Sequence, residues 1–489
     1  MVSFGEIPND VRTPGIHVEF DSSRALKGSP AQPHVALLVG QRLATGAVAA
    51  LVPTLMTRPS QFDEYFGRGS QLARMGAAFK GVNEYTEVRA IALDDDAAGT
   101  AAAGTITMAG APTKDGTLYL YVAGKRIPVP VTTADTSDTI ATAIAAAINV
   151  ETDLPATAAV DGVVTSEVDV TARNKGECGN YIDLRLNYYD GEQTPPGLTV
   201  TIVGMTGGAV NPDIGDALAA IGASQYATIG HPYTDATNLV ALETELAARW
   251  TAMNQTEGHA FTAAAGSLAE MSALGNSRNS PFSTILPTND SPSEPAVVAA
   301  MLAGVDAGEP DPARPRQTLA LTGMMPPARG AVFLRSERDI LLTDGISTFT
   351  VDSGGVCRVE RLISTYQTNP QGLPDTAYLD VCTLRTLSRM RFDLRATFNL
   401  KYPRHKLADD GTDFAPGQAI ITPSIGTAEV LRLARDEWVP QGLLENYEQF
   451  KKDLLLSRNT GDPSRLDGML APDLVNQFRL GAFLLQFIK

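Results

Sequence analysis

The chain has 489 residues, of which 44% are hydrophobic and 19% charged, the balance of a soluble globular protein. This length is too great for one ordinary hydrophobic core and predicts two to four domains. The formal net charge of −16 would be repelled by phosphate backbones, so we expect no nucleic acid among the main partners.

The first 32 residues show no helical period and contain several prolines. Within them Ile16, Val18 and Phe20 alternate with polar residues, the period-two pattern of a β-strand. No partner strand follows nearby in the sequence, so the backbone donors and acceptors of this strand are left for pairing elsewhere. The pattern fits an ordinary first strand of a domain as well as a free N-terminal arm over 1–32.

Residues 33–96 and 209–307 alternate predicted strands with predicted helices. The strands are nearly continuous apolar runs, which is typical of strands that are buried on both faces. Such an alternation predicts an α/β core with a mostly parallel sheet and helices on both faces. The predicted strands are 34–40, 88–93, 225–230, 259–265 and 283–286, and the predicted helices are 70–83, 235–253, 267–275 and 295–307.

Residues 97–208 interrupt this alternation directly after the acidic run Asp94–Asp96. They are rich in Ala, Thr, Val and Gly. The pattern predicts a hairpin over 117–131, one helix over 138–149 and three further strands. We therefore expect an inserted, protruding, mainly β domain, placed in a loop of the core where insertions are best tolerated.

The last third follows a proline-dense segment over 308–330, which we interpret as a linker. Residues 331–470 mix both kinds of element and predict an α+β C-terminal domain. Strands are predicted at 340–351 and 356–364, and helices at 375–402, 427–439 and 443–457. The multi-domain α/β architecture would thus end in one more domain, in which acidic and basic residues balance.

The C-terminal segment 471–489 is apolar on both faces of a strand period. Phe478, Leu480, Leu484 and Phe487 are its most conspicuous apolar residues. Exposing such a segment to water costs about 25 cal/mol per Å² of apolar surface. The pattern therefore predicts a C-terminal arm that is buried in this subunit or in a neighbouring one.

The sequence contains no motif that is typical of a catalytic, nucleotide-binding or metal-binding site. It contains no P-loop, GxSxG, HExxH or GxGxxG motif, its five histidines are scattered, and its three cysteines form no CxxC pair. We expect no enzyme, no cofactor and no bound metal. One alternative stays open, a cytosolic α/β enzyme in which Asp94–Asp96 hold Mg²⁺ at the end of a strand. We also expect neither a signal peptide nor a membrane-spanning segment.

Four arginines recur at i, i+4 spacing on the predicted helix over 375–402. They are Arg385 with Arg389, and Arg391 with Arg395. Such a basic face pairs with local acids or solvent, or meets an acidic partner surface.

Several segments together resemble the tail sheath proteins of contractile phages, most closely those of Mu-like phages. The similarity extends in order along essentially the whole chain. The segments are TPGIHVEF (13–20), FGRGSQLARM (66–75), TARNKGECGN (171–180), HPYTD (231–235), ILLTDGISTF (340–349) and RVERLISTY (358–366).

The resemblance implies a structural subunit that polymerises as helically stacked hexameric rings around a tail tube. Contraction would drive the tube through the host envelope and allow genome ejection. The implied partners are further copies of the chain, the tail tube protein, and baseplate and tail terminator proteins. The subunit would assemble in the host cytoplasm and end in the virion tail. A bacterial contractile injection sheath is an open alternative, as is another tail component such as a tube or baseplate protein.

By the same resemblance, both termini are arms that add strands to a sheet in neighbouring subunits. The insertion would protrude outward, and the arginine-bearing C-terminal third would lie nearer the tube. The implied inter-subunit residues are Ile16, Val18, Phe20, Phe478, Leu480, Leu484 and Phe487, and the implied tube-facing residues are Arg385, Arg389, Arg391 and Arg395.

Overall fold

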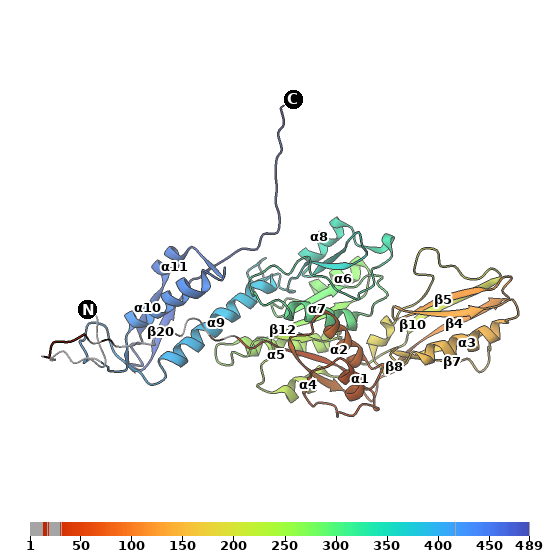
Figure 1. The fold of residues 1–489 in the computed structure, drawn as a ribbon, viewed down its shortest axis with the longest axis horizontal. Helices are drawn as coiled ribbons and strands as arrows, with labels where there is room; N and C mark the ends of the chain where they lie inside the picture. The colour runs from red at the N-terminus through yellow and green to blue at the C-terminus, as the bar shows by residue number, and fades with distance from the viewer. Residues whose placement is uncertain (1–12, 17, 19–29, 31, 416, 489) are drawn as a thin grey trace. The chain divides into compact units, whose positions relative to one another are not determined.

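The computed structural model (Figure 1) describes residues 13–16, 18, 30, 32–415 and 417–488. Its contacts divide the chain into two units. The core unit comprises His34–Pro310 and Arg316–Val381, and the terminal unit comprises Met1–Pro33, Asp311–Pro315 and Cys382–Lys489. The expected multi-domain mixture of helices and sheets is confirmed. The domain boundaries drawn from the sequence stay a prediction, and residues 316–381 group with the core unit.

A six-stranded sheet organises the core unit. Its strand order is β13-β12-β11-β1-β3-β2, and all neighbours are parallel except β2, which runs antiparallel to β3. The central strands are buried along nearly their whole length, as their continuous apolar sequences require. The strands are β1 (Val35–Gln41), β2 (Thr54–Met56), β3 (Glu87–Leu93), β11 (Thr228–Gly230), β12 (His259–Ala264) and β13 (Ser283–Pro287).

Three helices of this layer, α2, α5 and α6, begin at a capping side chain. Ser70, Asp235 and Ser267 each accept a backbone N–H in the first turn of the helix that follows. The predicted helices over 70–83, 235–253, 267–275 and 295–307 are confirmed, with small shifts at their ends. The helices are α1 (Ser60–Phe66), α2 (Gln71–Val82), α4 (Ile214–Ile221), α5 (Ala236–Trp250), α6 (Leu268–Asn276) and α7 (Pro295–Ala307).

The interrupting segment forms two antiparallel sheets and one long helix, and these pack around a hydrophobic core of their own. The predicted hairpin and helix are confirmed, but two alanine-rich strands, β4 and β7, have no counterpart among the predicted strands because alanine has low β-propensity. One sheet contains β10 (Leu198–Thr206), β4 (Ala101–Gly110), β8 (Glu167–Lys175) and β7 (Ala156–Val160). The other contains β6 (Lys125–Val131), β5 (Gly116–Val122) and β9 (Leu184–Leu186), and the helices are α3 (Ser137–Val150) and the 3₁₀ turn η1 (Glu177–Tyr181).

The predicted strand over 340–351 is wrong in its first half. Residues Arg335–Thr343 form helix α8, and only Thr348–Val351 form a strand, β14, which pairs with β15 (Cys357–Arg361). Glu337 accepts the backbone N–H of Leu334 and so caps the start of the helix. Gly345, at a φ of 78°, lies in the turn between helix and strand.

In the residues that the structure describes, the terminal unit contains three helices and three two-stranded sheets. Trp438, Phe450, Val430 and Leu433 belong to its hydrophobic core. The bounds are α9 (Val381–Lys401, which begins at the last residue of the core unit), β16 (Lys406–Leu407), β17 (Ile420–Ile421), α10 (Pro423–Leu433), the π-helical turn η3 (Ala434–Trp438), β18 (Leu444–Glu445), α11 (Tyr447–Asp453), β19 (Leu455–Arg458), β20 (Leu466–Met469) and β21 (Asp473–Leu474).

The predicted helix over 443–457 is correct only in its centre. Asn446 has left-handed backbone angles immediately before α11, so the helix does not extend back into β18. At the other end Leu454 is extended, and Leu455–Arg458 pair with β20. The helix predicted over 375–402 begins at Val381.

Candidate assembly surfaces

The C-terminal arm leaves the terminal unit after β21. Residues 475–488 form neither helix nor strand in the structure and run as an extended segment (Figure 1). The predicted arm residues Phe478, Leu480, Leu484 and Phe487 are all exposed, by at least 74%. Phe483, Leu485 and Ile488 are exposed as well, so the two-faced apolar pattern stands in solvent on both faces. A contiguous apolar surface of this kind marks an interaction site.

The N-terminal arm is described only in part. Ile16 and Val18 are exposed and belong to no strand, whereas Phe20 lies outside the described residues. The strand predicted over Ile16–Phe20 therefore stays a prediction.

Open strand edges are present in the terminal unit itself. Among the described residues, β19 and β20 pair with each other and with no third strand, and the same holds for β18 and β21. Leu455 and Met469 face each other across β19 and β20, and both side chains are about 60% exposed. A strand with one neighbour presents a row of N–H and C=O groups on its outer edge, and an exposed apolar pair adds contact area there.

The four arginines of α9 do not lie on one face. Arg385 and Arg389 form one row, and Arg391 and Arg395 form another, roughly 120° around the helix axis at 3.6 residues per turn. Arg395 is exposed, whereas the other three are partly buried. The fold therefore brings the predicted tube-facing residues together as two pairs rather than as a single basic stripe.

Asp94–Asp96 all accept hydrogen bonds from protein donors. Asp94 pairs with Arg42 at 2.7 Å, and Asp96 accepts the backbone N–H of Ala98 at 2.7 Å. Asp95 accepts three hydrogen bonds from side-chain and backbone groups. Among the described residues no group of three or more His, Cys, Asp or Glu side chains is arranged to hold a metal ion.

Arg68, in the glycine-rich turn before α2, lies near two carboxylates, with Asp63 at 3.8 Å and Asp153 at 3.4 Å. It thus connects the core with the end of α3 in the insertion. In the described part of the chain, no helix is long and apolar enough to cross a membrane.

Sequence reasoning missed two residues that the structure places at junctions. Asn174 bonds to the first residue of α2, 103 positions away, and Asp393 is fully buried in the terminal unit. The one local indication of Asn174 in the sequence was the run Asn174-Lys175-Gly176, which comes directly after a segment with alternating apolar residues. Nothing local in the sequence distinguishes Asp393 from a surface acid.

Comparison with known proteins gives a consistent result. Residues 207–365 match the phage tail sheath protein central domain, and residues 374–488 match the phage tail sheath C-terminal domain. The Mu-like prophage FluMu tail sheath protein of Haemophilus influenzae (strain ATCC 51907 / DSM 11121 / KW20 / Rd) is 39% identical over 489 residues, which cover 100% of this chain and 99% of the relative.

Similar solved structures include the sheath tail protein Lin1278 from Listeria innocua, with a TM-score of 0.49 and 13% identity over 92% of this chain and 93% of that one. The sheath tail protein DSY3957 from Desulfitobacterium hafniense gives a TM-score of 0.48 and 12% identity, covering 94% and 100%. The helical sheath of the anti-feeding prophage in the contracted state gives a TM-score of 0.47 and 10% identity, covering 97% and 98%.

Proposed function

The chain belongs to the phage tail sheath family, and from this premise we propose that its terminal arms connect identical subunits into a helical polymer around a tail tube. It is a structural component of a contractile phage tail and not an enzyme.

The observation that carries the proposal is the exposure of segment 475–488. Seven large apolar side chains stand in solvent there, namely Phe478, Leu480, Phe483, Leu484, Leu485, Phe487 and Ile488. A single copy of the chain leaves them uncovered, at about 25 cal/mol per Å² of apolar surface. A second copy of the chain would cover these side chains if the segment added as a strand to a sheet of that copy. Both faces of the segment are buried when a further layer packs on the added strand.

The outer edges of β19 and β20 are our candidate acceptors for the arms. These strands have unpaired outer edges in the described structure, and the exposed Leu455–Met469 pair adds apolar surface beside them. Donor and acceptor are then different surfaces of the same chain. A contact between two different surfaces generates a ring or an open helix rather than a closed dimer.

We propose that the subunits assemble into stacked hexameric rings, with the tail tube, baseplate and tail terminator proteins as partners. The insertion would point outward, and the terminal unit with its α9 arginines would lie nearer the tube. Contraction would proceed by rigid-body movement of subunits, with the arms as tethers that keep neighbours connected. The energy would come from a metastable extended state, so the proposal requires no nucleotide site.

Deleting residues 475–489 tests the role of the C-terminal arm. We expect the full chain to form tubes in a concentration-dependent manner by electron microscopy, and the deletion variant to stay monomeric by sedimentation velocity. Val163→Asp, at a 90% exposed apolar position in the insertion, is the matched control and should still form tubes. Tubes formed by the deletion variant would show that the arm is not the connecting element.

A further inference from the structure

The six-stranded sheet has a point at which its strand order reverses. From β1 the chain continues to β3 on one side, and it returns much later to β11 on the other side. In open α/β sheets a crevice forms at such a point, outside the carboxyl ends of the strands, and ligands bind there. Here the carboxyl end of β1 is Gln41, and the insertion begins just after β3.

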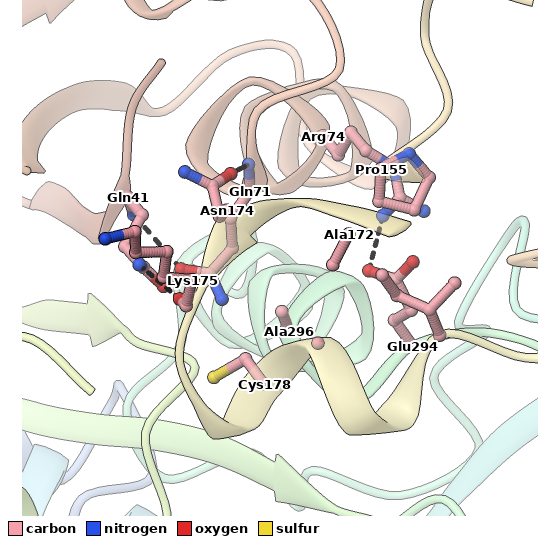
Figure 2. A pocket seen from close by; sticks show the side chains of 12 residues that line it. Gln41, Gln71, Arg74, Pro155, Ala172, Asn174, Lys175, Cys178, Glu294 and Ala296 are labelled. Atoms are coloured by element: carbon pink, nitrogen blue, oxygen red, sulfur yellow. Dashed lines mark hydrogen bonds and ion pairs between the residues drawn. The ribbon is translucent and has the colours of Figure 1, made fainter. Parts of the chain in front are cut away.

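The insertion itself occupies this crevice. Figure 2 shows Gln41, Gln71, Asn174 and Lys175 gathered at one side of the remaining space, with Cys178 on η1 beside them. The cavity left between them has a volume of about 30 Å³. Small-molecule sites usually measure roughly 300–1,000 Å³, so the crevice is filled by protein and has no room for a substrate.

Asn174 makes the contacts that a bound ligand would make. Its Oδ1 accepts the backbone N–H of Gln71, the first residue of α2, at 3.0 Å. Its Nδ2 donates to the carbonyl of Arg42, directly after β1, at 3.0 Å. The N-terminus of a helix facing a strand-end crevice is where α/β proteins bind anions, because its first N–H groups have no partner within the helix. In this chain a side chain of the insertion satisfies one of those donors.

Asp95 holds Asn174 in this position. Its carboxylate accepts hydrogen bonds from Gln41 Nε2 at 2.7 Å, Asn174 Nδ2 at 3.0 Å and the backbone N–H of Lys175 at 3.0 Å. Gln41 also donates to the carbonyl of Lys175 at 2.7 Å and is fully buried. Hydrogen bonds to a carboxylate are stronger than neutral ones, so one charged group ties the end of β1 to the end of β8.

The insertion makes further contacts with the rest of the core unit, and the ion pairs among them include exposed side chains. Arg185 reaches Asp290, whose side chain is 54% exposed, and Tyr188 donates to the carbonyl of Pro326 at 2.8 Å. Arg68 and Asp153 are both largely exposed. Exposed ion pairs contribute little, typically about 0–1 kcal/mol, so we expect the partly buried hydrogen bonds of Asp95 and Asn174 to contribute more to the docking than these pairs do.

We propose that Asn174 is an intramolecular ligand of the strand-end crevice and that Asp95 is the positioning residue that keeps it there. The docking of the insertion onto the sheet then depends on this junction. Loss of the Asp95 carboxylate should let the end of β8 separate from α2 while both hydrophobic cores stay folded.

Hydrogen–deuterium exchange on the unassembled full chain tests the proposal, with Asp95→Asn compared with Asp94→Asn. Asp94 is the matched control because it is the adjacent carboxylate, is 62% exposed and pairs with Arg42. We expect Asp95→Asn to accelerate exchange of the Gln71 and Lys175 amides by roughly tenfold or more, because the charged acceptor is lost. Amides of β12 and β13 should exchange as in the unmodified chain.

Equal protection of Gln71 and Lys175 in both variants would overturn the proposal, as would equal acceleration in both. If Asp95→Asn does not fold, Asn174→Ala supplies the same measurement at Gln71. Faster exchange at Gln71 with an intact six-stranded sheet supports the junction. Unchanged exchange there contradicts it.

Discussion

The guanidinium of Arg389 lies 3.0 Å from the carboxylate of Asp393, one helical turn further along α9. Asp393 has no exposed side-chain surface and also accepts the indole N–H of Trp438 at 3.1 Å. The pair therefore links α9 to the π-helical turn that ends α10. Because a substitution at Arg389 would also disturb the buried Asp393, we test the proposed contact with the tube at the pair that includes the exposed Arg395.

Arg389→Ala should destabilise the terminal unit. Removing one partner of a buried pair leaves an uncompensated carboxylate, which costs about 3–5 kcal/mol. Urea denaturation followed by tryptophan fluorescence would measure the change, since Trp438 bonds to the same carboxylate. Arg435→Ala is the control, because Arg435 and Asp436 are both exposed and such a pair contributes about 0–1 kcal/mol. Equal effects of the two substitutions would contradict this role of Asp393.

Arg391→Glu combined with Arg395→Glu should weaken tube-dependent assembly. Arg395 is exposed on α9, and reversal of charge turns attraction to an acidic partner into repulsion. Co-sedimentation of sheath with purified tube, at two salt concentrations, would measure the effect. Arg435→Glu, also exposed in the terminal unit but outside β19 and β20, should leave assembly unchanged. Normal assembly of the double variant would show that this pair does not face the tube.

Leu484→Asp and Phe487→Asp should each abolish polymerisation. The two positions are three residues apart, so they lie on opposite faces of an added strand. Both are exposed in the single chain, and a charge buried at either position without a partner is strongly unfavourable. Light scattering during assembly would measure the loss. If only one substitution blocks assembly, the arm is buried on one face only, and the two-faced interpretation is wrong.

His231 should make the core unit less stable in acid. Burial lowers the pKa of its imidazole to about 4, and the nearby Asp235 offsets only part of this effect. The unfolded chain, with a pKa near 6.5, therefore binds the proton more readily. The contribution of neutral His231 to the free energy of unfolding is therefore fully present above pH 6.5 and decreases as the pH falls toward 4.

His231→Leu should accordingly reduce the difference in unfolding free energy between pH 7.5 and pH 4 by on the order of 3 kcal/mol. Chemical denaturation of both proteins at several pH values would measure it. An identical pH dependence in the two proteins would show that His231 is not the group responsible.

Gly76→Ala should destabilise α2, whereas Gly81→Ala on the same helix should not. A Cβ atom at Gly76 would lie 1.9 Å from the ring of Phe62, and one at Gly81 would meet nothing within 4 Å. We expect a loss of about 1–3 kcal/mol at Gly76 from overpacking, and a gain of about 0.5–1 kcal/mol at Gly81 from helix propensity. Thermal unfolding of the two variants would measure both. A similar shift at the two positions would show that the close packing of Phe62 on α2 is not limiting.

The sequence alone was sufficient for the elements whose signals are local. Helices α2 and α5 were predictable because their apolar residues recur every three or four positions and a capping side chain precedes each. The two-faced apolar character of segment 475–488 was equally visible. Strand β4 was not predictable in this way, because its alanine-rich sequence gives only a weak period. Helix α8 was not predictable either, because a turn and a strand follow it directly and mix two periods in one short stretch.

Only the tertiary structure decided which polar groups meet. The contacts of Asp95 with Lys175 and of Asn174 with Gln71 join residues 80 and 103 positions apart. Such pairs depend on strand order and on where the insertion returns to the sheet, and neither leaves a local period in the sequence. The sequence by itself thus determined the elements and the apolar arm, because periodicity and burial act locally. The fold determined the polar junctions, because hydrogen bonding between distant residues depends on topology.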